Sequence, residues 1–196
     1  NYSGYIKKRL SDYSGALEDY SKAIEIDPKY LYAFICRGST RLRINDYFMA
    51  IEDYSKAIEI DSKYALAYHN RGAAKHKIKD FMSAIEDYST AIEIEPFYSD
   101  AYNRRGAAKK EINDFTGAIE DYLKAIEIDP NCKYAYFNLG FLKQQFKDYE
   151  GAIKDYSKAI EIDQNFAEAF NNRGVIKFEL KDFDGANKDY CCAADL

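Results

Sequence analysis

The nine residues "DYSKAIEID" occur at Asp19–Asp27, at Asp53–Asp61 and again at Asp155–Asp163. The first two copies begin 34 residues apart, and the third begins 102 residues after the second, which is three times 34. Looser copies fill the two intervening slots, and a worn copy, "DYCCAADL", ends the chain. A fixed period of this length is the sequence signature of a stacked array. We therefore expect one unit of 34 residues, written about six times.

The bulk composition is that of a folded, soluble protein, with 47% hydrophobic and 31% charged residues. The formal charge is −5 and the isoelectric point about 5.2, so no nucleic-acid partner is expected. No apolar run approaches the roughly 20 residues that a membrane-spanning helix needs, so no membrane insertion is expected either. The four cysteines form neither a CxxC pair nor a repeating framework, which favours a reducing compartment and a cytoplasmic location.

One repeat, residues 65–98, predicts two helices joined by a tight turn. In its second half, apolar residues recur at steps of 3, 4, 7, 10 and 11 from Phe81, which is the stripe of an amphipathic helix. Asp80 is placed to cap the start of this helix, and Pro96 marks its end. A second helix is expected in the first half of the repeat. Since two such helices cannot bury both apolar faces alone, neighbouring repeats must stack.

All ten glycines fall into two rows of the repeat. A glycine inside a helix costs roughly 0.5–1 kcal/mol relative to alanine. Its repetition at one place therefore predicts a large group, a tyrosine ring or the partner helix, pressed against that backbone. Tyr88 and its equivalents are predicted to be buried, and Glu93 and its equivalents exposed. The first row is Gly4, Gly38, Gly72, Gly106, Gly140 and Gly174, and the second is Gly15, Gly117, Gly151 and Gly185.

Charges are separated by helix within each repeat. Arg71 and Lys75 stand four residues apart on the first helix of the third repeat, where two cations repel each other. Similar pairs recur in other repeats, while the second helices are acidic. The pattern predicts that acidic residues of an adjacent second helix interleave with these cations as an internal ion-pair ladder.

With this pattern of residues, the chain resembles the tetratricopeptide repeat family. The landmark residues in the third repeat are Tyr68, Gly72, Ala84, Tyr88, Ala91 and Pro96. The resemblance covers the whole chain as a single domain, with partial repeats at 1–30 and 167–196 and full repeats at 31–64, 65–98, 99–132 and 133–166. It implies an all-α fold, a right-handed superhelical solenoid of antiparallel helix pairs. The chain starts at Asn1, partway into a repeat, and reads as an excerpt from a longer protein.

Catalytic residue types are present, but their positions follow the repeat. His69 and His76 are the only histidines, and no acid or cysteine stands beside them at ligand spacing. Paired carboxylates such as Glu86 and Asp87 recur in most copies, which indicates a scaffold position and not a single active site. We therefore predict a protein that is not an enzyme and has no cofactor and no metal site.

Function is then read from the positions that vary between copies. The resemblance implies that first helices line a concave groove, where partners bind. The leading hypothesis is a scaffold for protein–protein interaction that binds a peptide or a partner helix there, its asparagine amides donating to and accepting from the ligand backbone. The alternative is a structural spacer or self-assembling segment with no groove ligand. The candidate groove residues are His69, Asn70, Asn103, Arg104, Lys110, Tyr134, Phe137, Asn138, Phe141, Asn171, Asn172 and Phe178.

Two further expectations concern the partner. Arg43, Lys77, Arg104 and Lys110 make the first half of the groove basic, and the last third is aromatic, so we expect a ligand with an acidic stretch over repeats two to four and an apolar anchor over repeats five and six. The last helix should leave Ala186, Tyr190, Ala193 and Ala194 partly uncovered, near the exposed first helix of the opening repeat. Such ends favour head-to-tail self-association.

Overall fold

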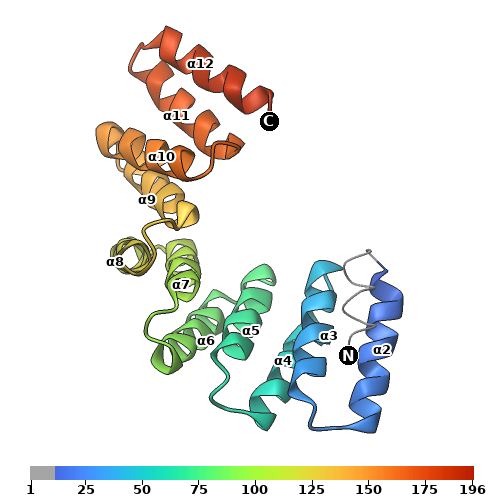
Figure 1. Ribbon diagram of the computed structural model, residues 1–196. Coiled ribbons are helices and arrows are strands. Elements are labelled where there is room, and N and C mark those ends of the chain that lie inside the picture. Colours follow the sequence, from blue (N-terminus) through green and yellow to red (C-terminus); the bar gives the residue numbers. More distant parts are fainter. Residues whose placement is uncertain (1–11) are drawn as a thin grey trace. The chain divides into compact units, whose positions relative to one another are not determined.

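The computed structural model describes residues 12–196, which contain eleven α-helices and no strand (Figure 1). The fold class expected from the period, an all-α array of helix pairs, is confirmed for these residues. The first helix of the opening repeat, together with Gly4, falls outside the described residues. The helices are α2 (Tyr13–Ile26), α3 (Leu31–Arg43), α4 (Tyr47–Ile60), α5 (Ala65–Lys77), α6 (Phe81–Ile94), α7 (Ser99–Glu111), α8 (Phe115–Ile128), α9 (Lys133–Gln145), α10 (Tyr149–Ile162), α11 (Ala167–Glu179) and α12 (Phe183–Ala194).

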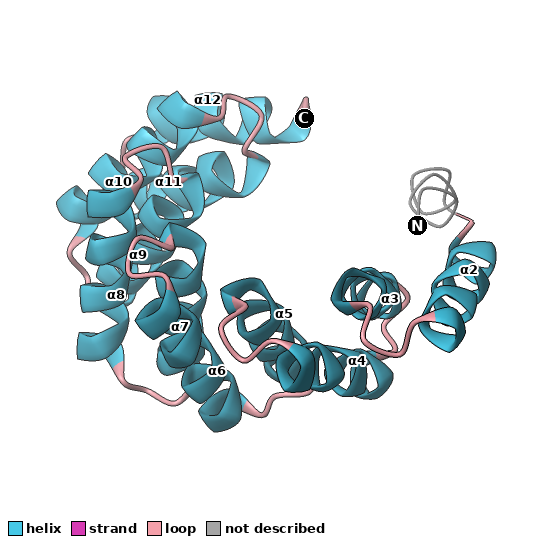
Figure 2. Ribbon diagram, turned by 60° about the horizontal axis from the view of Figure 1, so that its bottom comes forward, coloured by secondary structure: helices cyan, strands magenta, loops and turns pink. Residues whose placement is uncertain are grey.

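The chain divides into two compact units, residues 1–97 and 98–196. In the first unit α3 packs against α4 and α5 against α6, and α4 also packs against α5. In the second unit the pairs are α7 with α8, α9 with α10 and α11 with α12, joined through α8 on α9 and α10 on α11 (Figure 2). Each helix pair corresponds to one 34-residue repeat, so the stacking expected from the sequence is present within each unit.

A left-handed residue turns the chain between the two helices of a repeat. These residues are Asn45, Lys79, Asn113, Lys147 and Lys181, with φ between 62° and 65°. In the turn after α3, the N–H of Asp46 donates to the carbonyl of Arg41 at 2.8 Å and the N–H of Asn45 to that of Leu42 at 3.2 Å. This is the Schellman arrangement, which satisfies the last carbonyls of a helix. The turn is thus closed by backbone hydrogen bonds, even where a lysine occupies the left-handed position.

The second row of glycines serves the caps of the second helices. The Asp114 side chain accepts a hydrogen bond from the N–H of Gly117 at 3.0 Å, and a Cβ at that glycine would lie 2.3 Å from the carboxylate. Where serine replaces glycine, the N–H of Ser83 lies 3.3 Å from Asp80. Where methionine does, at Met49, Asp46 makes no such bond. The glycine therefore lets the capping carboxylate approach the helix end.

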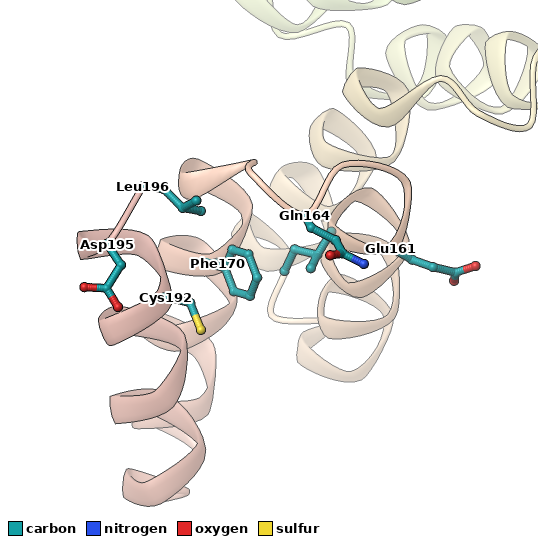
Figure 3. Close-up of a pocket in the computed structure, with 7 residues that line it drawn as sticks. Glu161, Gln164, Phe170, Cys192, Asp195 and Leu196 are labelled. Carbon is teal, nitrogen blue, oxygen red and sulfur yellow. The ribbon is translucent and has the colours of Figure 1, made fainter.

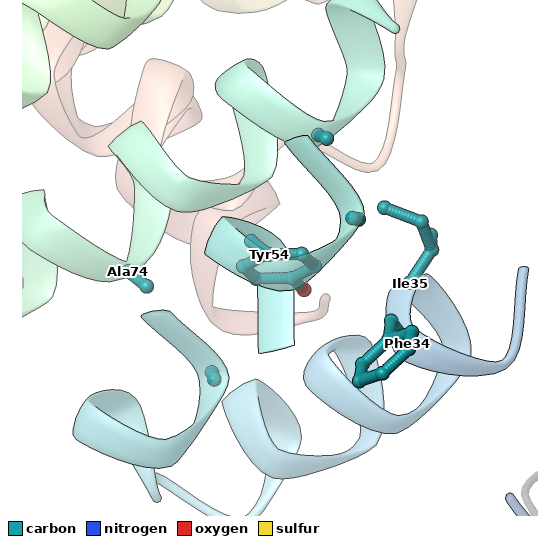
Figure 4. Packing of buried hydrophobic residues seen from close by; sticks show 7 residues of the cluster. Phe34, Ile35, Tyr54 and Ala74 are labelled. Carbon is teal, nitrogen blue, oxygen red and sulfur yellow. The ribbon is translucent and has the colours of Figure 1, made fainter. Parts of the chain in front are cut away.

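The first row of glycines makes room for tyrosine rings, as predicted. A Cβ on Gly38 would lie 2.8 Å from the ring of Tyr54, and equivalent contacts recur in each later repeat. Figure 4 shows Tyr54 among Phe34 and other apolar side chains of its cluster. Tyr190 is half-buried. The tyrosines that are 0–1% exposed are Tyr20, Tyr54, Tyr88, Tyr122 and Tyr156.

The predicted ion-pair ladder is also present. Asp87 of α6 is buried and receives Arg71 at 2.7 Å and Lys75 at 2.8 Å from α5. The same arginine donates to Ser55 Oγ of the preceding repeat at 3.1 Å, which ties the two repeats together. Glu86 and the residues equivalent to Glu93 are exposed, as expected. Matching pairs bury Asp53, Asp121 and Asp189, but in the fifth repeat Leu139 replaces the arginine and Asp155 meets only Lys143.

Candidate functional site

In the second unit, the first helices α7, α9 and α11 lie side by side, because α9 contacts both of the others. Their adjoining faces carry most of the predicted groove residues. The nearest pair is Asn138 and Asn103, whose side chains are hydrogen-bonded at 2.9 Å. Asn103 is only 6% exposed. The amide of Asn103 therefore holds Asn138 in place, and Asn138, which is half-buried, is the member of the pair nearer to solvent.

Both predicted cations of α7 have partners on the same helix. Arg104 pairs with Asp100 at 3.1 Å, and Lys110 pairs with Glu111 at 3.0 Å. The Lys110 ammonium also lies 5.2 Å from the centre of the Phe141 ring, a cation–π contact between α7 and α9. The cations are thus locally balanced by carboxylates. Exposed pairs of this kind are weak and can exchange partners.

Aromatic side chains gather where α9 meets α11. The Phe137 ring lies 5.0 Å from that of Phe166 and 5.6 Å from that of Tyr156, and Tyr134 stands edge-on to Phe166 at 5.6 Å. Phe137 is half-buried and packs against two clusters of the core. Tyr134 is 53% exposed. Phe137 therefore belongs partly to the core, whereas Tyr134 is more exposed to solvent and has the Lys133 ammonium 4.9 Å from its ring centre.

A hollow of about 410 Å³ opens beside Phe137. Its polar side chains are Glu168, Asn171 and Asn172 of α11, and Ala167 and Ala193 complete its wall. Ala193 comes from α12, which the groove prediction did not include; its only signal in the sequence was its place on the apolar stripe of the last helix. The hollow joins an aromatic surface to two amides, and it is the strongest candidate site among the described residues.

The buried Tyr156 is hydrogen-bonded and interacts with one of these amides. The Tyr156 hydroxyl donates to Gln144 Oε1 at 2.8 Å. Burial raises the pKa of Tyr156, and a hydrogen bond with Asn172 works in the opposite direction. The phenol is therefore neutral at physiological pH and acts as a fixed hydrogen-bonding group under Asn172.

The remaining predicted residues lie elsewhere. Phe178 is 56% exposed and packs on Phe183 at 5.3 Å, and it does not line the hollow. In the first unit, His69 is 6% exposed and lies 5.7 Å from the ring of Tyr88, so its position is that of a core side chain. Asn70, next to it on α5, is half-buried.

A second hollow, of about 470 Å³, lies at the end of the last helix pair (Figure 3). It is formed by α10, α11 and the end of the chain, and Phe170, Cys192 and Leu196 line it. The expectation that Ala186 is partly uncovered is wrong, because α11 covers the start of α12 and leaves Ala186 1% exposed. Tyr190 and Ala193 are half-buried and Ala194 is exposed, as expected. The opening repeat's first helix lies outside the described residues.

Two further kinds of site are absent from residues 12–196. No group of three or more histidine, cysteine, aspartate or glutamate side chains is placed to hold a metal ion. None of the helices is both long and apolar enough to cross a membrane.

Family models match most of the chain. The model described as TPR repeat matches residues 38–79 and 147–181. Two models described as Tetratricopeptide repeat match residues 65–98 and 99–132 in one case and 3–30 in the other. Among curated proteins, none matches the chain significantly.

Solved structures resemble the chain over most of its length. MamA is 30% identical, with a TM-score of 0.74, over 84% of this chain and 96% of that one. PilF of Pseudomonas aeruginosa is 20% identical, with a TM-score of 0.84, over 95% of this chain and 85% of its own. YrrB is 23% identical, with a TM-score of 0.66, over 91% of this chain and 92% of its own. Because PilF and YrrB are less than 25% identical to this chain, the likeness to them shows a shared fold.

Proposed function

The chain belongs to the tetratricopeptide repeat family, and from this premise we propose that it is a non-enzymatic scaffold that binds a peptide or partner helix on the α7–α9–α11 face. The observation that carries the proposal is the hollow beside Phe137, where an aromatic surface meets the amides of Asn171 and Asn172. The fold is compatible with such a role, since its neighbour YrrB is described as a TPR protein with an unusual peptide-binding site.

The two kinds of surface in the hollow have different tasks. An asparagine side chain offers one acceptor and two donors, so it can pair with both the C=O and the N–H of an extended peptide. The adjoining aromatic surface of Phe137 and Tyr134 takes an apolar side chain of the ligand, which is the anchor. Apolar pockets with a few placed polar groups are the usual form of a ligand site.

We further propose that an acidic stretch of the ligand follows the anchor towards α7. There a ligand carboxylate exchanges with Asp100 for Arg104, or with Glu111 for Lys110. Both existing pairs are partly exposed, so such an exchange costs little. This contact supplies orientation and association rate more than affinity.

The test is selection of displayed random peptides on the purified protein, followed by calorimetry of the enriched sequence. Asn171→Ala is expected to weaken binding by about fivefold, the value of one lost hydrogen bond. Asn187→Ala, an exposed asparagine on α12, is the matched control and should leave affinity unchanged. Equal effects of the two substitutions would contradict the proposal. Phe137→Ala is a poorer test, because that ring also supports the core.

The alternative is a spacer that assembles end to end. Light scattering over a hundredfold range of concentration separates the two readings. Growth of the particles with concentration supports assembly. A constant monomer mass, together with an enriched peptide that binds, supports the scaffold.

A cytoplasmic location stays a prediction.

A further inference from the structure

The fifth repeat contains a complete binding site for an ammonium group, filled by the chain itself. The Lys133 ammonium lies 4.9 Å from the centre of the Tyr134 ring and 5.0 Å from that of Phe166. It also pairs with Asp163 Oδ2. The ring faces attract the cation through their quadrupoles, and the carboxylate accepts a charge-assisted hydrogen bond from it. Two rings and one carboxylate therefore hold one lysine side chain.

The second repeat also has two aromatic rings and a carboxylate at these positions of the repeat, but it has no lysine at the position of Lys133. Tyr32 and Tyr64 stand where Tyr134 and Phe166 stand in the fifth repeat, and Asp61 stands where Asp163 does. The position of Lys133 is taken by Leu31, whose side chain packs into the core cluster of the first unit.

The geometry of the two sites agrees. The rings of Tyr32 and Tyr64 are 6.1 Å apart at an interplanar angle of 85°, against 5.6 Å and 75° in the fifth repeat. Asp61 Oδ1 accepts the N–H of Lys63 at 2.9 Å, and Asp163 Oδ1 accepts the N–H two residues on at the same distance. In the fifth repeat the other carboxylate oxygen, Asp163 Oδ2, pairs with the Lys133 ammonium. Among the described residues, no hydrogen bond or ion pair is made to the other oxygen of Asp61.

The site in the second repeat is open to a partner. Tyr32 is 59% exposed, Asp61 is exposed and Tyr64 is half-buried. Burial is the main cause of the raised pKa of Tyr64, and Asp61 and Glu95 are among the charges that add to it, so two carboxylates act on this ring. The surroundings are thus negative and aromatic, which suits a cation.

The combination is confined to these two repeats. The other full repeats carry Leu66 and Asp100 at the position of Tyr32, so neither can form the ring pair. The likeness between repeats two and five is therefore not a by-product of the 34-residue period.

We propose that Tyr32, Tyr64 and Asp61 bind a protonated lysine side chain of a partner protein, in the place that Lys133 fills in the fifth repeat. A primary ammonium group can donate an N–H to the carboxylate. A trimethylated lysine has no N–H on its side-chain nitrogen, so the site should prefer the unmodified lysine. The site lies in the first unit and uses none of the residues of the hollow beside Phe137. It also replaces the expectation that the ligand is acidic opposite the second repeat.

The direct test is an NMR titration of protein carrying ring-¹³C tyrosine, with Nα-acetyl-lysine N-methylamide as the probe. Contacts of one ammonium group with two rings and one exposed carboxylate give a dissociation constant on the order of 10 mM. Saturable shifts are expected for Tyr32 and Tyr64, whose signals are assigned from Tyr32→Phe and Tyr64→Phe. The Nε-acetylated probe should give no shift, and the Nε-trimethylated probe should bind about threefold or more weakly. Equal shifts with the acetylated probe would overturn the proposal.

Two substitutions sharpen the test. Asp61→Asn keeps an acceptor for the N–H of Lys63 but removes the negative charge. It should lower the affinity for the probe about fivefold or more. Asp129→Asn is the matched control, because Asp129 makes the same backbone bond to Asn131 in a repeat without the ring pair. If both substitutions leave the affinity unchanged, the carboxylate has no role and the proposal fails.

The reverse change vacates the fifth repeat. Lys133→Leu copies the second repeat and should make Tyr134 respond to the probe, while circular dichroism confirms the fold. A folded variant in which Tyr134 gives no response would show that the rings and Asp163 do not form an ammonium site. Neither experiment uses a groove peptide, so failure here leaves the proposed scaffold function standing, and failure of that function leaves this site standing.

Discussion

The fourth and fifth repeats, both in the second unit, bury the same carboxylate with different partners. Asp121 meets Arg105 at 2.7 Å and Lys109 at 2.8 Å. Asp155 meets Lys143 at 2.7 Å, and Leu139 occupies the arginine position. The fifth repeat has thus exchanged one cation for an apolar side chain that joins the cluster around Tyr122 and is 4% exposed.

The exchange involves a second position. In other repeats this arginine also donates to a serine 16 residues earlier, as Arg173 does to Ser157 at 2.9 Å. Sixteen residues before Leu139 stands Leu123, not serine. The arginine of the fifth repeat and its serine partner in the fourth are therefore absent together, and the fifth repeat is the one whose first helix carries the aromatic residues beside the hollow.

Burial and ion pairing oppose each other in setting the pKa of these carboxylates, and the number of cations does not decide the balance alone, since the pKa of Asp53 is raised although Arg37 and Arg41 both pair with it. Burial is the main cause of the raised pKa of Asp155, and Lys143 only partly opposes it. For Asp189 of the sixth repeat, burial acts in the same direction, but hydrogen bonds from Arg173 and Lys177 outweigh it and the pKa is lowered. Ionised Asp155 therefore lowers the stability of the fold at neutral pH. The fold regains this stability when Asp155 is protonated, as the pH falls through its raised pKa. Asp189 contributes stability that is lost as the pH falls through its lowered pKa.

The largest expected effect comes from removing each carboxylate. Asp121→Ala removes the shared carboxylate from Arg105 and Lys109, which are both 18% exposed, and should cost about 3 kcal/mol of unfolding free energy. Asp155→Ala frees one lysine that is 30% exposed and should cost about 1 kcal/mol. Urea unfolding followed by circular dichroism measures both. Equal losses would mean that the second cation has no energetic role.

The next effect concerns the helix glycines of the same two repeats. A Cβ on Gly106 would lie 2.8 Å from the Tyr122 ring, whereas one on Gly140 would lie 3.1 Å from the Tyr156 ring. Gly106→Ala should therefore cost about 2 kcal/mol by overpacking. Gly140→Ala should cost about 1 kcal/mol less, because a smaller shift of the ring suffices. Thermal unfolding of the two variants checks the order, and a reversed order would contradict the ring-contact explanation.

These contacts divide into those that the repeat dictates and those that it does not. The helix pairs, the tyrosines over glycines and the ladder around Asp87 could be predicted from sequence, because the same physical requirement is written several times. The bond between Asn103 and Asn138 could not, since it joins variable positions that occur together once. The left-handed turn at Lys79 was also missed, because lysine carries no signal for positive φ, unlike glycine or asparagine.

A third prediction restores the missing pair. Leu139→Arg together with Leu123→Ser rebuilds the arrangement of Arg173 and Ser157 in the fifth repeat. The unfolding free energy of the double variant should exceed the sum of the two separate effects by about 1 kcal/mol, because each new residue is the hydrogen-bond partner of the other. A double-mutant cycle in urea measures this coupling. Additive effects would show that the joint loss of arginine and serine is coincidental.

The smallest effect lies in the turns. Lys147 and Asn113 both have φ of 62°, a conformation that costs most side chains energy but that asparagine tolerates. Lys147→Gly should raise the unfolding free energy by about 0.5 kcal/mol. Asn113→Gly should change it by less than half as much. Paired thermal melts test this, and a larger gain at Asn113 would show that backbone conformation does not set the difference.

The proposed function depends on peptide binding by the face that α9 and α11 build. The most direct measurement is the amide NMR spectrum of ¹⁵N-labelled protein, recorded during titration with the peptide enriched by display. We expect the largest shifts in residues 134–141 of α9 and 167–175 of α11, around Phe137 and Asn171. Shifts that instead concentrate on the second helices α8, α10 and α12, with α9 and α11 unchanged, would contradict it.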